Sequence, residues 1–270
     1  MAQYDLFEKK PNSSPLDVEA YMTRIGSVRE YRPSLRFLRQ LHRNHLLHIP
    51  FENLDIHIGN QIILDIDLIF EKVIRQKRGG FCYELNGLFY HLLVELGFQT
   101  KLLSARVVAD DGSLGPEFEH LMIMVYLDDK QWLVDVGYGS SFINPKEFVP
   151  GLVQMDYNRF FRINERSDGN YVLQSSNDSQ TFNDEYVFSK KTRQFVEFIG
   201  MCQYHQTSPK SKFTQKKIIT QATADGRITL SDKKFIVTKM GKKEELPILN
   251  NDEFLVKVRE QFGVRLRKKY

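Results

Sequence analysis

The sequence predicts an α+β fold, with helices in the first third of the chain and a sheet after them. Segments whose apolar residues recur at helical spacing run up to Gly97, whereas β-branched and aromatic runs begin at Lys101. We find no internal repeat and no regular alternation of strand and helix, which argues against a doubly wound sheet. The 270 residues, 41% of them apolar, suffice for one large domain or about two to three small subdomains.

Capping residues locate the early helices. Ser14-Pro15-Leu16-Asp17 combines a capping residue, a proline and a first-turn acid, and predicts a short helix over 15–25. Ser34 caps a second helix, which is expected to end before Ile49-Pro50. Asp67 is expected to open a third helix.

Strand-forming runs dominate the rest of the chain. The first three are KLLSARVV, HLMIMVYL and QWLVDVGY. Further strands are predicted at RFFRI, YVLQ, KIITQAT, RITL and KFIVTKM, with helices near 192–202 and 252–262. The proline-containing segment 143–158 is expected to cross the surface as a connection.

Charge and cysteine content restrict the class of protein. The net charge of +4 comes mostly from lysines in the last third, which fit a solvated face or a patch for a phosphorylated small molecule but not a nucleic-acid surface. Cys82 and Cys202 lie far apart and outside any C-x-x-C pair, so neither a disulfide framework nor a thiolate zinc site is indicated. Since no secretion signal or membrane-length apolar run is evident, we expect a cytoplasmic protein with reduced thiols and no membrane partner.

Cys82 lies at the start of the clearest predicted helix, directly after Gly79-Gly80. Leucines and a phenylalanine recur every three or four residues from Leu85 to Leu96, and Gly97 ends the helix. The glycines allow a ligand to approach the backbone, and the free N–H groups of a helix start stabilise a thiolate. A buried cysteine is usually inert packing, but this position favours a nucleophile.

A thiol nucleophile requires a base and a group that orients the base, and His120 and Asp135 fit those roles. If Asp128-Asp129 forms a two-residue turn, Asp135 lies opposite Met122, two residues from His120 and on the same face of the sheet. A slip of one residue would separate them. Asp135 also lies in a run predicted to be buried, where a carboxylate needs a partner.

Other site types are less well supported. His42, His45 and His48 recur every three residues, but no acidic or cysteine ligand accompanies them, so no metal site is predicted. His57, His91 and His205 are interpreted as surface or packing residues. The sequence contains no phosphate-binding glycine motif.

Three segments resemble the signature segments of the arylamine N-acetyltransferases: RGGFCYELN around Cys82, EFEHLMIMV around His120 and WLVDVGYGSSF around Asp135. The resemblance continues in YMTRIG, HIPFENLDI and CQYHQTSPKSKF, and is strongest up to about residue 145. It implies a helical bundle over 1–97, a β-barrel-like domain over 98–190 and an α/β lid over 191–270. The first two parts would form a core similar to that of papain-like cysteine enzymes.

The resemblance also implies an activity and its residues. Cys82, His120 and Asp135 match a triad that moves an acetyl group from acetyl-coenzyme A, a co-substrate, to the nitrogen of an arylamine, hydrazine or hydroxylamine, with no tightly bound cofactor. Glu119 would border the acceptor site and Tyr138 would contact the acceptor ring, although core packing explains Tyr138 equally well. Contacts with coenzyme A are implied for Tyr204, Thr207, Ser208 and Lys210.

Two alternatives remain open at this point. A cysteine peptidase or transglutaminase would use the same triad on an amide donor. A catalytically silent binding protein would keep the scaffold without using Cys82.

Overall fold

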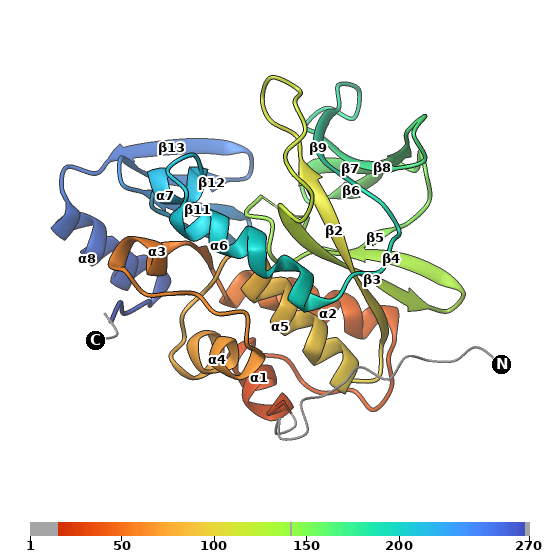
Figure 1. The fold of residues 1–270 in the computed structure, drawn as a ribbon, viewed down its shortest axis with the longest axis horizontal. Helices are drawn as coiled ribbons and strands as arrows, with labels where there is room; N and C mark the ends of the chain where they lie inside the picture. Colours follow the sequence, from red (N-terminus) through yellow and green to blue (C-terminus); the bar gives the residue numbers. More distant parts are fainter. Residues whose placement is uncertain (1–15, 141, 268–270) are drawn as a thin grey trace.

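Two antiparallel sheets and a group of helices make up the computed structural model, which describes residues 16–140 and 142–267. The helices are α1 (Val18–Arg24), α2 (Leu35–His48), α3 (Leu54–Ile58), α4 (Ile66–Phe70) with its π-helical continuation (Glu71–Arg75), α5 (Cys82–Glu95), a 3₁₀ turn (Phe195–Phe198), α6 (Ile199–Thr207), α7 (Lys212–Gln215) and α8 (Asn251–Phe262). In Figure 1, α2 and α5 run beneath the sheets and α1 and α4 lie below them. The α+β prediction is confirmed.

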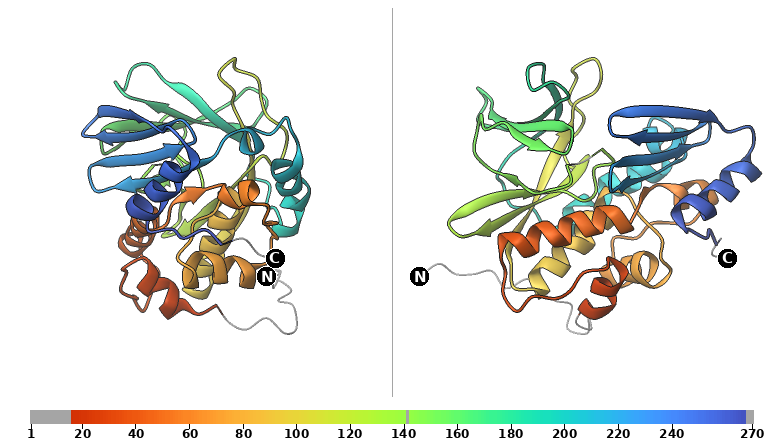
Figure 2. Two further views of the ribbon diagram at one scale, coloured as in Figure 1. Left: turned by 90° about the vertical axis from the view of Figure 1, so that its left-hand side faces the viewer. Right: turned by 180° about the vertical axis from the view of Figure 1, so that it is seen from behind.

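The larger sheet has eight strands. In spatial order they are β5 (Lys146–Glu147), β4 (Lys130–Val134), β3 (His120–Leu127), β2 (Gln99–Val107), β9 (Asn183–Phe188), β8 (Tyr171–Ser176), β7 (Arg159–Glu165) and β6 (Gln154–Asp156). The amide of Gln154 exchanges two hydrogen bonds, both 2.9 Å, with the backbone of Glu147, which connects the two edge strands. The sheet therefore curls toward a barrel, as Figure 2 shows.

The smaller sheet has five strands. In spatial order they are β1 (Phe51–Glu52), β10 (Ile218–Thr223), β11 (Gly226–Ser231), β12 (Lys234–Lys239) and β13 (Lys242–Pro247). Its inner side packs on α8 through a separate apolar cluster that includes Leu230 and Phe254. Since β1 precedes α5 in the sequence, this sheet joins the last part of the chain to the helical part.

Strands β2 to β4 are apolar on both faces because each face covers a core. Leu121, Ile123 and Val134 pack against the helices, α5 above all. Met122, Met124 and Leu133 alternate with them and fill the inside of the barrel-like sheet. The continuous apolar runs in the sequence follow from this double burial.

Several boundaries differ from prediction. The first helix begins at Val18 and is capped by Asp17, whose carboxylate accepts the N–H of Ala20 at 3.0 Å; the expected cap at Ser14 and Pro15 lies outside the described residues. Ser34 caps the second helix as predicted. The third is capped by Asp65 rather than Asp67, because only a residue before the first turn can accept its N–H groups.

The later chain contains more strands than predicted. Segment 143–158 is not only a surface connection: it contributes β5, β6 and a buried ion pair, with Lys146 Nζ 2.9 Å from Asp156. Strand β13 is a fully exposed, charged edge strand, which leaves no apolar alternation to detect. The helix expected near 192–202 begins as the 3₁₀ turn at Phe195 and continues to Thr207. Among the described residues, no helix has the length and hydropathy needed to cross a membrane.

Candidate active site

Cys82 is the first residue of α5, as predicted, and only 3% of it is exposed. Burial raises the pKa of its thiol, and the charge of Asp135 acts in the same direction. The backbone N–H groups of Leu121 and Tyr83 oppose this effect but do not outweigh it. The expected thiolate stabilisation by the helix start is therefore present only in part, because burial outweighs it.

The predicted hairpin register is correct. Leu127 pairs with Lys130 across Asp128-Asp129, which have φ values of 51° and 58°, both in the left-handed region that a type I′ turn requires. Pairing continues to Ile123 and Val134, so the next residue, Asp135, faces the barrel interior together with His120. Nε2 of His120 lies 2.8 Å from Oδ2 of Asp135.

The carboxylate of Asp135 is surrounded by hydrogen-bond donors although it is fully buried. Oδ2 accepts from His120 and, at 3.1 Å, from the hydroxyl of Tyr186. Oδ1 accepts from the side chain of Asn86 at 2.8 Å and from the N–H groups of Gly137 and Tyr138, both at 3.0 Å. Burial raises the pKa of Asp135, but these donors and the His120 imidazole outweigh it, so the pKa lies below its usual value.

Side chains of α5 bond to the backbone before and after His120 and to the carboxylate of Asp135. The hydroxyl of Tyr83 donates to the carbonyl groups of Phe118 and Glu119 at 2.8 and 3.1 Å, directly before His120. One turn along the helix, Asn86 donates to the carbonyl of Leu121 at 2.6 Å as well as to Asp135. The helix that carries Cys82 therefore also fixes the backbone on both sides of His120.

Gly137 brings the Asp135 segment against the start of α5. A Cβ at this position would lie 2.8 Å from Cα and 2.9 Å from the carbonyl oxygen of Cys82, and 2.7 Å from Nδ2 of Asn86. No side chain fits at such distances. Gly137 is therefore required for close approach of backbone to backbone.

Two acceptor-site residues of the sequence prediction lie near the pair. The ring of Tyr138 is 5.2 Å from that of His120 in an edge-to-face arrangement, and 5.2 Å from Tyr186. Glu119 precedes His120, and its Oε2 accepts the N–H of Val107 at 3.1 Å; burial raises its pKa. Both side chains therefore contact neighbouring residues of the site instead of projecting freely.

The four residues implied for coenzyme A lie at the end of α6 and just after it. Tyr204, Thr207 and Lys210 are exposed, and Ser208 is half-buried. Their recorded bonds stay within the segment: Thr207 donates to the carbonyl of Gln203 at 2.9 Å, and the N–H of Ser208 to that of Tyr204 at 2.9 Å. The ring of the neighbouring His205 stacks on Tyr83 at 6.1 Å, so this segment packs against α5.

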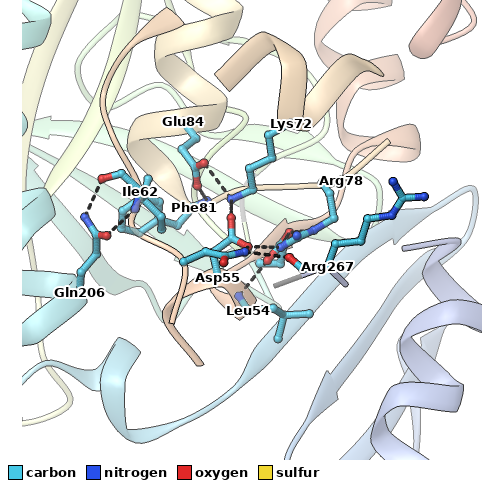
Figure 3. Close-up of polar contacts among 11 residues, drawn as sticks. Leu54, Asp55, Ile62, Lys72, Arg78, Phe81, Glu84, Gln206 and Arg267 are labelled. Atoms are coloured by element: carbon cyan, nitrogen blue, oxygen red, sulfur yellow. Dashed lines mark hydrogen bonds and ion pairs between the residues drawn. The ribbon is translucent and has the colours of Figure 1, made fainter. Parts of the chain in front are cut away.

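A buried cluster of charges supports the start of α5 from below (Figure 3). Nζ of Lys72 lies 2.8 Å from both Glu84 and Asp55, and the guanidinium of Arg78 lies 2.7 Å from Glu52 and 3.0 Å from Asp55. Glu84, on the first turn of α5, also accepts the N–H of Phe81 at 3.1 Å. The glutamate thus links the charge cluster to the helix start that carries Cys82.

Sequence reasoning missed three residues of the site: Asn86, Tyr186 and His42. Asn86 and Tyr186 bond to Asp135, yet neither belongs to a sequence pattern that predicts a polar contact with it. His42 was considered only as a metal ligand; it instead accepts the backbone N–H of Asp135 at 3.2 Å. Within the described ranges, no group of three or more His, Cys, Asp and Glu residues is arranged to hold a metal ion.

Comparisons with known proteins show which family the chain belongs to. A family model described as N-acetyltransferase matches residues 34–270. The chain is 31% identical to the chicken arylamine N-acetyltransferase, pineal gland isozyme NAT-3, over 94% of this chain and 96% of that protein, and 30% identical to human arylamine N-acetyltransferase 1 over the same shares.

Solved structures are similar over the same extent. The arylamine N-acetyltransferase from Salmonella typhimurium has a TM-score of 0.86 at 28% identity, with 92% of this chain and 90% of that chain covered. The enzyme from M. tuberculosis has a TM-score of 0.86 at 31% identity, with 92% and 94% covered.

Proposed function

The chain belongs to the arylamine N-acetyltransferase family, and from this premise we propose that it moves an acetyl group from acetyl-coenzyme A to an aromatic amine through acetylated Cys82. The observation that carries the proposal is the buried 2.8 Å contact between His120 and Asp135 beside the start of α5. Such a pair activates a thiol that could not otherwise ionise at neutral pH.

In the proposed roles, Cys82 is the nucleophile, His120 the base and Asp135 the orienting group. The carboxylate of Asp135 only accepts hydrogen bonds, so Nε2 of His120 carries a proton. Nδ1 is then the nitrogen that takes the proton from the thiol of Cys82. Because burial raises the pKa of Cys82, this transfer is needed before attack.

The reaction proceeds in two halves. The sulfur of Cys82 attacks the thioester carbonyl, the C–S bond to coenzyme A breaks, and the proton held by His120 passes to the departing thiolate. The amine then attacks the acetyl-cysteine, His120 removes its proton and returns it to the Cys82 sulfur, and the amide leaves. The N–H of Cys82 at the helix start is the proposed donor to the oxyanion in both halves.

Finer assignments stay proposals. Tyr138 and Glu119 are proposed to border the acceptor amine, which their position beside His120 supports. Tyr204, Thr207, Ser208 and Lys210 are proposed to contact coenzyme A, on the family resemblance alone. The division into a bundle, a barrel-like domain and a lid at residues 97 and 190, and a cytoplasmic location, also remain predictions.

The test is to incubate the protein with acetyl-coenzyme A and measure the mass of the Cys82 peptide. We expect one added acetyl group, its loss when an arylamine or hydrazine is added, and no adduct in Cys82→Ser. A panel of amines with acetyl-, propionyl- and malonyl-coenzyme A then defines the substrates. A wild-type Cys82 that reacts with alkylating agents but takes no acetyl group would point instead to an amide donor, as in a cysteine peptidase or transglutaminase.

A further inference from the structure

The first four backbone N–H groups after β4, from Asp135 to Tyr138, each donate to a side chain. The β3–β4 ladder ends at the Ile123–Val134 pair. Beyond it, the N–H of Asp135 donates to Nε2 of His42 at 3.2 Å, and that of Val136 to Oδ1 of Asn86 at 2.8 Å. The next two N–H groups donate to the carboxylate of Asp135 itself. The backbone that carries this carboxylate is therefore held by two side chains outside the segment, those of His42 and Asn86.

His42 is one of those side chains, and its hydrogen bonds define its state. Nδ1 lies 2.9 Å from the carbonyl oxygen of Ile143, which can only accept, so Nδ1 carries the proton. Nε2 faces the N–H of Asp135, which can only donate, so Nε2 must be unprotonated. The two contacts together require the neutral ring with its proton on Nδ1. Protonation of Nε2 would break the hydrogen bond from the N–H of Asp135.

The surroundings of His42 keep the ring neutral and fixed. It is fully buried on α2, stacked on Phe142 at 5.5 Å and 9°, with the edge of Phe89 at 6.2 Å. Burial lowers the pKa of His42 to about 4, although the Ile143 carbonyl and the charges of Asp135 and Asp156 raise it; Lys146 acts with burial. Both the low pKa and the two hydrogen bonds therefore favour an uncharged ring at neutral pH.

We propose that His42 is a positioning residue of the active site: its neutral imidazole accepts the Asp135 N–H and thereby holds the carboxylate that orients His120. It also ties Asp135 to Ile143, the two ends of the loop that carries Tyr138. This inference rests on the proposed function for its meaning, because a held Asp135 matters only if His120 acts as a base. The contact itself is independent of any acyl donor.

Two amide substitutions separate positioning from packing. In His42→Gln the amide oxygen reaches about the position of Nε2 and can still accept from Asp135. In His42→Asn the amide reaches about the position of Nδ1, so it can donate to Ile143 but not accept from Asp135. We expect His42→Gln to keep a near wild-type rate of Cys82 alkylation. His42→Asn should lower that rate at neutral pH by about tenfold, because the loss of one buried hydrogen bond corresponds to a rate change of that order.

The pH profile of alkylation gives a readout that lost packing would not move. With Asp135 displaced, the Cys82 thiolate and its imidazole partner lose the carboxylate that supports their ion pair. The thiolate should therefore form at higher pH in His42→Asn, and the profile of His42→Gln should not shift. Iodoacetamide is the reagent, and mass spectrometry of the Cys82 peptide distinguishes it from Cys202. In acetyl transfer, kcat should fall in His42→Asn, while KM for acetyl-coenzyme A stays within about twofold.

His45 supplies the matched control. It lies one turn further along α2, is equally buried and also contacts Phe89, but its Nδ1 bonds to the Tyr21 hydroxyl at 2.8 Å. His45→Asn and His45→Gln should therefore leave the alkylation profile unchanged, even if both lower the thermal midpoint.

Two outcomes would overturn the positioning role: equal alkylation profiles for His42→Asn and His42→Gln, or a shift in His45→Asn as large as in His42→Asn. The proposed function can fail separately. If wild type takes no acetyl group but the His42 variants still differ in alkylation, the acetyl-transfer proposal is wrong and the positioning role holds. If wild type is acetylated and the His42 variants show equal alkylation profiles, the acetyl-transfer proposal holds and the positioning role of His42 is wrong.

Discussion

Nε2 of His120 lies 2.8 Å from Oδ2 of Asp135, and the helix that carries Cys82 braces the backbone on both sides of this contact. Asn86 bonds to Asp135 and to the residue after His120, and Tyr83 bonds to the residues before it. The three proposed catalytic residues thus come from α5, β3 and the segment after β4, which share one set of hydrogen bonds. Substitutions in that set should therefore be detectable as changes in the reactivity of Cys82.

Asp135→Asn should abolish most of the activity while the chain still folds. The amide has one acceptor oxygen where the carboxylate has two, so some of the donors from His120, Tyr186 and Gly137 lose their partner. His120 is then free to adopt the wrong tautomer, which costs roughly 10³-fold or more in kcat. Steady-state kinetics measure the effect, and thermal unfolding checks the fold. A loss of less than about tenfold in a folded protein would contradict the orienting role.

Gly137→Ala should damage the site through backbone contact alone. The added methyl group would meet Cys82 and Asn86 at distances below 3 Å, so the Asp135 segment must move away from α5. We expect alkylation of Cys82 at neutral pH to fall by at least about tenfold. Gly200→Ala on α6 is the control, since its Cβ would meet nothing within 4 Å and should be neutral or slightly stabilising. Similar alkylation rates in the two variants would refute the steric argument.

Local and pairwise patterns made the core of the site predictable. The α5 start follows from Gly79-Gly80 and the leucine spacing, and the facing of His120 and Asp135 follows from a turn of two residues. Both depend only on neighbours along the chain or across one hairpin. The same applies to the cap at Ser34, which accepts the N–H of Phe37 three residues away.

Contacts between distant segments were not predictable in this way. His42 is 93 residues from Asp135 in the sequence, and its apolar surroundings on α2 give no sign of a polar partner. Tyr186 lies on β9, whose first half is polar and exposed, so even the strand was missed. The pKa of Cys82 also follows from total burial, which outweighs the local helix start. These features depend on how the helical core packs against the core of the eight-stranded sheet.

Lys72→Met should destabilise the fold more than any surface ion-pair substitution. Lys72 is 8% exposed and neutralises Asp55 and Glu84, both 2.8 Å from its Nζ. Its removal leaves two buried carboxylates short of a cation, which costs about 3–5 kcal/mol of unfolding free energy. Because Glu84 also bonds to the N–H before Cys82, activity should fall as well.

Lys130→Met is the matched control for Lys72→Met. Lys130 pairs with Glu147 at 2.8 Å, but its side chain is 55% exposed, so the pair contributes at most about 1 kcal/mol. Urea denaturation of both variants measures the difference. If the two lose the same free energy, the buried cluster does not stabilise the fold in the way its contacts indicate.

Acid should weaken the fold through Asp55. Burial raises the pKa of this carboxyl, but Lys72 and Arg78 outweigh it and bring it from 3.8 to about 2. A carboxyl with a lower pKa in the folded than in the unfolded chain stabilises the fold above its unfolded pKa. That stability is lost as the pH falls through the folded pKa. For Asp55 the loss in unfolding free energy is about 2 kcal/mol between roughly pH 4 and pH 2. The pKa of Asp135 is lowered too, so its contribution has the same sign.

Urea denaturation across this acid range tests the assignment to Asp55. Asp55→Asn should be less stable than wild type at neutral pH but lose less free energy on acidification, because its amide does not titrate in this range. The exposed Asp232→Asn should keep the wild-type slope, since its side chain leaves water in neither state. Parallel curves for wild type and Asp55→Asn would show that other carboxyls cause the acid sensitivity, and the ion pairs of Asp55 with Lys72 and Arg78 would then contribute little.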